Sequence, residues 1–144
     1  MSSARSTEAA TGRAGWTALL PAGYHVGWVL ASYVLVATVV WLSLTPSTVP
    51  PGVGGLDKWG HALAYGLLTA WFAGFYPRAR HWRVVAWLFV LGAALEVAQA
   101  GMRLGRTGEL ADLIANTLGI GIGAAVSVLT VDWPRRLERW LGRA

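Results

Sequence analysis

Four long apolar segments, separated by short polar loops, dominate the pattern of this chain. They cover residues 25–44, 57–76, 82–101 and 109–131. A helix rises about 1.5 Å per residue, so about 20 residues cross a hydrocarbon layer of about 30 Å. Pro46 and Pro77 end the first two segments, because proline does not continue a helix. The pattern predicts an all-α fold, an integral membrane bundle of four transmembrane helices.

The two ends of the chain have a different character. Residues 1–22 are rich in Ser, Ala, Thr and Gly, and we expect a disordered tail because they offer little apolar surface. Residues 23–131 form the predicted membrane domain. Residues 132–144 begin with Asp-Trp-Pro, a helix-starting sequence, and place Trp133, Leu137, Trp140 and Leu141 on one face. We predict a C-terminal amphipathic helix in the membrane interface.

Composition and charge support this class and set an orientation. Hydrophobic residues make up 55% of the chain and charged residues 13%, against about 25% charged residues in soluble domains. The net charge of +5 comes from arginines that flank the spans, which argues against a nucleic-acid-binding surface. Most of the Lys and Arg residues lie in the N-terminal tail, the second loop and the C-terminal segment. The positive-inside rule therefore places both termini in the cytoplasm.

Polar residues recur at helical spacing in three of the spans. The second span carries Asp57, Lys58, His61 and Tyr65, the third carries Glu96 and Gln99, and the fourth carries Glu109, Asp112 and Asn116. The loop before the fourth span adds Arg103 and Arg106. In an up-down bundle all of these positions lie toward the outer face. Ionisable groups within a bilayer are costly and usually functional or paired, so we expect them to form one site.

Within this site, residue chemistry suggests different roles. Glu96 and His61 are the candidate acid and base, and Asp57 lies one turn before His61 and could orient its ring. We expect a binding role for Asp57, Lys58, Tyr65, Gln99, Arg106, Asp112 and Asn116. Asp57, His61, Glu96 and Asp112 could also supply metal ligands, but spacing alone is weak support. The sequence therefore predicts no obligatory metal and no other cofactor.

The same residues resemble a known family. The motif from Asp57 to Tyr65 (DKWGHALAY), then Glu96 to Gln99 (EVAQ), Arg106, and Asp112 to Gly119 (DLIANTLG) are similar to the VanZ-like membrane proteins. The resemblance covers about residues 42–123. It implies a bacterial, multi-pass protein of the inner (plasma) membrane and a link to resistance against teicoplanin, a glycopeptide antibiotic with a fatty acyl chain.

Three functions remain open. The first is binding or remodelling of an amphiphile at an outer-leaflet polar pocket, either a lipoglycopeptide such as teicoplanin or an envelope lipid. The second is a membrane-embedded acid/base enzyme acting on a lipid-linked phosphate or acyl bond, so whether the chain is an enzyme stays open. The third is a proton-coupled transporter, which would require a homodimer. The expected partner is in each case a membrane lipid or a small amphiphilic molecule.

Overall fold

The computed structural model describes residues 26–45, 54–102, 110–130 and 132–142. Its elements in chain order are α1 (Val26–Leu44), α2 (Gly54–Ala73), the 3-10 helix η1 (Arg78–Arg80), α3 (His81–Met102), α4 (Leu110–Ser127) and α5 (Trp133–Trp140). All regular structure within these ranges is helical, which confirms the all-α prediction. The expected tail at residues 1–22 lies outside the described residues.

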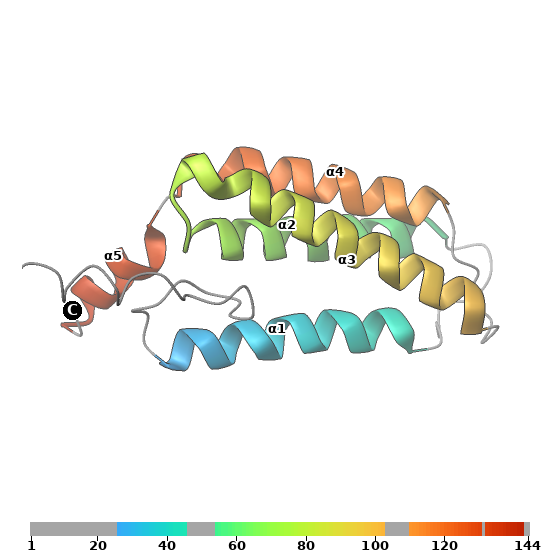
Figure 1. The fold of residues 1–144 in the computed structure, drawn as a ribbon, viewed down its shortest axis with the longest axis horizontal. Helices are drawn as coiled ribbons and strands as arrows, with labels where there is room; N and C mark the ends of the chain where they lie inside the picture. Colours follow the sequence, from blue (N-terminus) through green and yellow to red (C-terminus); the bar gives the residue numbers. More distant parts are fainter. Residues whose placement is uncertain (1–25, 46–53, 103–109, 131, 143–144) are drawn as a thin grey trace, which may run out of the picture.

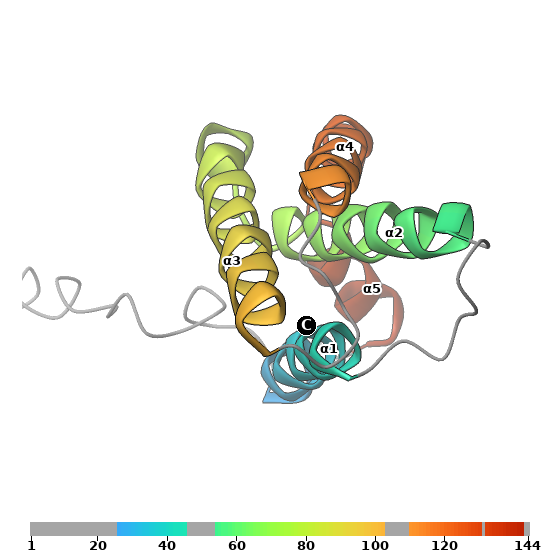
Figure 2. The ribbon, with the colours of Figure 1, turned by 90° about the vertical axis from the view of Figure 1, so that its right-hand side faces the viewer.

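The four long helices run alternately up and down (Figure 1). The starts of α2 and α4 and the ends of α1 and α3 lie at the same end of the bundle, and α5 lies at the opposite end (Figure 1). Viewed along the bundle, α2 lies between α4 and α1, and α3 runs along one side (Figure 2). The residues expected to share one end of the bundle therefore do so on α2, α3 and α4.

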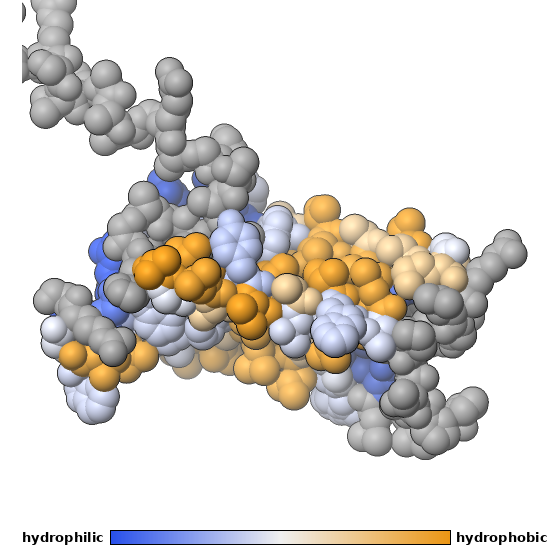
Figure 3. All heavy atoms as spheres, turned by 90° about the horizontal axis from the view of Figure 1, so that it is seen from below, coloured by the Kyte–Doolittle hydropathy of each residue, from blue (hydrophilic) through white to orange (hydrophobic). Residues whose placement is uncertain are grey.

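Three of the helices are long and apolar enough to cross a membrane. The candidate spans are Val26–Leu44, Arg78–Met102 and Leu110–Ser127. Large apolar side chains cover much of the middle of the face seen in Figure 3, and hydrophilic ones lie toward its ends. The helix α2 has 20 residues but is less apolar than the other three. A four-span bundle, its orientation and an interfacial position for α5 remain predictions.

The closest approach between helices is that of α2 to α4, and glycines allow it. A Cβ atom on Gly119 would overlap the backbone carbonyl oxygen of Ala62, and one on Gly123 would overlap that of Gly66. Small residues four positions apart let helix backbones touch within a membrane. Gly119 and Gly123 thus bring α4 into backbone contact with α2.

The helices also end differently from the expected spans. The second span was expected to reach Tyr76, but α2 ends at Ala73 and continues as tight turns through Tyr76. The fourth span was expected to reach residue 131, but α4 ends at Ser127. After both helices, backbone N–H groups bond to carbonyls three residues earlier, which tightens the last turn. Both regular helices are therefore shorter at this end than hydropathy indicates.

An aromatic cluster anchors α5 at this end of the bundle. The Trp133 ring packs edge-on against Trp28 at 5.3 Å and against Trp71 at 5.2 Å between ring centroids. The Trp28 indole N–H also donates to Glu138 Oε1 at 2.6 Å. The sequence analysis did not foresee this cluster. Three elements distant in sequence, α1, α2 and α5, are held together by it.

Candidate polar binding site

Five of the expected site residues come together where α2 and α4 begin. Asp57 and Lys58 lie in the first turns of α2 and His61 one turn further on, while Asp112 and Asn116 lie on α4. We call these five residues the α2–α4 polar cluster. Carboxylates in the first turn of a helix interact favourably with its dipole, which helps to explain why Asp57 and Asp112 stand there. The glycine contacts one to two turns deeper bring the two helices close enough for these side chains to meet.

An ion pair and a hydrogen bond join the helices across the cluster. Lys58 Nζ lies 3.5 Å from Asp112 Oδ1, and the Lys58 side chain is 40% exposed whereas that of Asp112 is 8% exposed. One turn deeper, His61 Nδ1 lies 3.1 Å from Asn116 Oδ1. An amide oxygen only accepts, so the imidazole donates through Nδ1–H. In neutral His61 this leaves Nε2 with a free lone pair.

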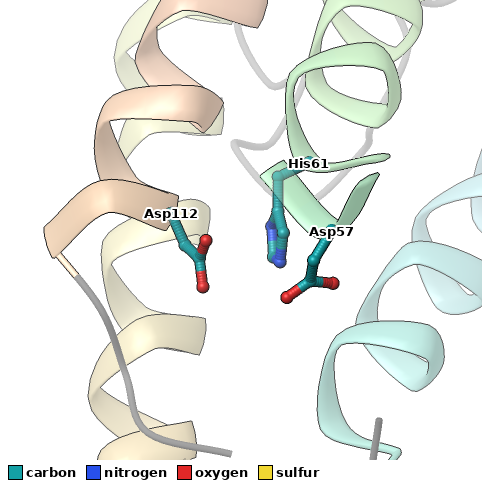
Figure 4. A group of neighbouring side chains, drawn as sticks. All are labelled: Asp57, His61 and Asp112. Atoms are coloured by element: carbon teal, nitrogen blue, oxygen red, sulfur yellow. The ribbon is translucent and has the colours of Figure 1, made fainter. Parts of the chain in front are cut away.

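The ring of His61 stands between two carboxylates. Figure 4 shows Asp57 on the same helix and Asp112 on the facing helix, with the imidazole between them. One ligand atom from each of the three side chains lies within 4.8 Å of the others. Asp112 Oδ1 is buried and makes no hydrogen bond among the described residues. The arrangement concentrates negative charge around one imidazole.

Tyr65 lies one turn deeper than His61 on α2, and Glu96 lies on α3. Tyr65 is 1% exposed, and its hydroxyl has no hydrogen-bond partner among the residues the structure describes. Gly92 on α3 leaves room for the Tyr65 ring and for the Asn116 amide, each 3.3 Å from where a Cβ atom would stand. Glu96 follows Gly92 by one turn and is also buried. Because α3 runs toward the end of the bundle where α2 and α4 begin, Glu96 lies closer to that end than Gly92 does (Figure 1).

Gln99 faces a different neighbour from the one expected. Its Nε2 donates to the backbone carbonyl oxygen of Ser43 on α1 at 2.5 Å. The side chain therefore links α3 to the last turn of α1, where the helix offers no further internal N–H donors to its carbonyl groups. Arg103, Arg106 and Glu109, which were expected to complete the site, lie outside the described residues.

A second buried polar group, which the sequence analysis missed, lies at the other end of the bundle. His81 is buried at the start of α3, with Nε2 3.1 Å from the Tyr76 carbonyl oxygen and Nδ1 3.2 Å from Ser127 Oγ. A carbonyl only accepts, so Nε2 carries a proton. The feature of the sequence that could have indicated this group is a histidine directly after a basic loop. Its contacts join the last turn of α4 to the first turn of α3.

These features define the class of protein. Long apolar helices that turn large hydrophobic side chains outward and keep their few polar groups inside are typical of membrane proteins. The chain is a membrane protein.

A comparison with protein families then identifies its family. The model of the VanZ/LLP1 family matches residues 28–131, which include all of the four long helices except the first two residues of α1. The chain belongs to the VanZ/LLP1 family. No match was found among curated proteins or among solved structures.

Proposed function

We propose that this protein binds an amphiphile, with the polar headgroup at the α2–α4 polar cluster and the acyl chain along the bundle. The observation that carries the proposal is the position of a charged, partly accessible cluster at one end of a bundle whose outer surface is apolar. In the proposed orientation that end faces the outer leaflet of a bacterial plasma membrane. Lys58 and the carboxylates could then meet the charges of a headgroup, since the Lys58 side chain is 40% exposed.

An apolar hollow supports a place for the acyl chain. It lies between α3 and α4, has a volume of about 510 Å³, and is lined by Trp82, Val85, Ala86, Phe89, Thr117, Ile120, Gly121 and Ala124. Thr117 follows Asn116 directly, so the hollow begins at the depth where the α2–α4 polar cluster ends. A headgroup and a tail of one molecule would thus find polar and apolar surfaces in the right order.

The family supports one kind of ligand. The founding member of the VanZ-like proteins is associated with resistance to teicoplanin, a glycopeptide that carries a fatty acyl chain, and an acylated drug and an envelope lipid share this amphiphilic build. We expect the chain to protect a sensitive bacterium against teicoplanin more than against a glycopeptide without an acyl chain. Growth inhibition by both drugs measures this difference.

Variants of the residues proposed to contact the headgroup and the acyl chain test this proposed binding site. Glu96→Gln or His61→Ala should abolish the protection, and Gly121→Leu should reduce it by filling the hollow while leaving the polar end intact. Asp132→Asn, an acid-to-amide change in the turn before α5, is the matched control and should keep full protection. Full protection in all three site variants, with wild-type amounts of inserted protein, would refute the proposal.

A second candidate is an acid/base enzyme, favoured by the tautomer of His61. Its Nε2 is left free to accept a proton by the bond to Asn116, and the buried Glu96 would supply the acid. Incubation of the purified protein with envelope lipids, followed by mass spectrometry, tests this candidate. A new lipid product that His61→Ala fails to form would favour the enzyme over the binding protein.

A further inference from the structure

The α2–α4 polar cluster has the features of a divalent-metal site, although spacing in the sequence gave only weak support for one. Asp57, His61 and Asp112 offer two carboxylate oxygens and one imidazole nitrogen within 4.8 Å of one another. Metal–ligand bonds of about 2.1 Å in tetrahedral geometry place ligand atoms about 3.4 Å apart. The widest pair therefore needs to close by no more than about 1.4 Å, which side-chain rotation can supply.

The state of the imidazole is a second, independent observation. Metal-bound histidines usually donate their other ring N–H to an oxygen, which fixes the tautomer and the ring orientation. Asn116 Oδ1 is that acceptor for His61 Nδ1, at 3.1 Å, and Asn116 is itself 2% exposed. The nitrogen left to bind a metal is Nε2. This is the arrangement expected behind a metal-binding histidine.

The state of Asp112 is a third observation. Its Oδ1 is buried without a hydrogen bond among the described residues, and its counter-ion, Lys58 Nζ, is 3.5 Å away. A charge-assisted hydrogen bond between such groups is normally about 2.7–2.9 Å long. A buried carboxylate oxygen held at this distance from its counter-ion is costly to keep. A directly bound cation would remove that cost.

We propose that Asp57, His61 and Asp112 bind one divalent transition-metal ion, of which Zn²⁺ is the best match. Imidazole with carboxylates suits Zn²⁺ better than Mg²⁺ or Ca²⁺, which prefer oxygen ligands alone. Three protein ligands leave a fourth position for water or for an anionic oxygen. Without the metal, Lys58 is the cation that pairs with Asp112. When the metal binds, Lys58 moves aside, which its 40% exposed side chain allows.

Binding of Co²⁺ and Zn²⁺ to the purified full-length chain in detergent tests this proposal without any amphiphile. Tetrahedral Co²⁺ with mixed nitrogen and oxygen ligands shows visible absorption, so a titration reports both stoichiometry and geometry. The wild type should bind one ion per chain, and added Zn²⁺ should bleach the Co²⁺ absorption. Substoichiometric uptake without these bands by the folded wild type would overturn the proposal.

Three variants locate the site. Asp112→Asn should weaken binding by more than about 100-fold, because loss of a direct ligand exceeds the roughly 10- to 100-fold cost of losing a residue that supports one. Asp132→Asn, the matched change outside the site, should bind as the wild type does. Equal binding by the two variants would contradict the assignment of the site.

Lys58→Met distinguishes a metal site from a simple ion pair. If Lys58 competes with the metal, its removal strengthens binding by about five- to tenfold, as expected for one nearby charge largely screened by water. If the cluster is only a salt bridge, the variant binds no metal. This variant keeps every proposed ligand, so it decides the question even where Asp112→Asn fails to fold. Unchanged or weaker binding in Lys58→Met would also count against the proposal.

Discussion

Replacement of Gly119 by alanine is the sharpest test of how the two helices hold the site. The added methyl group would overlap the carbonyl oxygen of Ala62 and would lie 2.8 Å from its carbonyl carbon and 2.9 Å from its Cα. Ordinary contact begins near 3.4 Å, and all three atoms belong to the backbone. No side-chain rotation relieves this overlap, so α2 and α4 must move apart by about 1 Å or more.

The cost follows from this forced separation. Inserting a methyl group into a well-packed contact usually destabilises a protein by about 1–3 kcal/mol. The matched control is Gly121→Ala on the same helix, where nothing lies within 4 Å of the new Cβ atom. That variant keeps the intrinsic gain of alanine over glycine in a helix, about 0.5–1 kcal/mol. Because both variants carry this gain, we expect them to differ by the cost of the overlap alone, about 1–3 kcal/mol, with Gly119→Ala the less stable.

Reversible unfolding in mixed detergent micelles, followed by the circular dichroism of the helices, measures the difference. The separation should also stretch the bond from His61 to Asn116. His61 is next to Ala62 on α2, and Asn116 lies one turn before Gly119 on α4. Metal binding by Gly119→Ala should then weaken as well, whereas Gly121→Ala should leave it unchanged. Equal unfolding free energies for the two variants would refute the close approach of α2 and α4.

Three further substitutions test other contacts. Trp133→Leu removes the edge-on ring contacts that hold α5, so amide hydrogen exchange across α5 should become faster; an unchanged rate would show that the ring contacts do not hold the helix. Gln99→Leu removes the hydrogen bond to the Ser43 carbonyl. It should lower the free energy of unfolding in the same assay by about 0.6 kcal/mol, the average for such bonds in membranes, and a gain in stability would contradict this. Gly92→Ala places a methyl group 3.3 Å from the Tyr65 ring, so its stability should fall between those of Gly119→Ala and Gly121→Ala, and a larger loss than in Gly119→Ala would contradict the packing order.

Helical spacing predicted part of the site because it fixes which residues share a face. The four-residue steps from Asp57 to His61 and from Asp112 to Asn116 placed each pair on one side of its helix, and the structure turns these sides toward each other. The glycines at 119 and 123 were likewise predictable, since residues without side chains mark where backbones meet within a membrane.

Spacing does not say which neighbour a face meets, and this is where the sequence analysis fell short. Glu96 and Gln99 share a face of α3, yet the Gln99 side chain bonds to α1 instead of joining the α2–α4 polar cluster. Tryptophans near the ends of membrane helices are typical anchors at the lipid headgroups. Trp41 and Trp59 are indeed exposed, but Trp28 and Trp133 pack against each other. Such contacts depend on how helices cross, which hydropathy does not encode.

α2 carries most of the site, and it is also the long helix whose composition is least typical of a membrane span. Asp57, Lys58 and His61 lower the hydropathy of α2, and it is absent from the candidate spans. Its opposite face nevertheless exposes Trp59, Leu63 and Leu67 at four-residue steps, each more than half exposed. A helix with large apolar side chains outward and paired polar groups toward its neighbours is suited to lipid on one side only. The low hydropathy of α2 is therefore a consequence of the site it carries, and its apolar outer face agrees with the prediction of a fourth span.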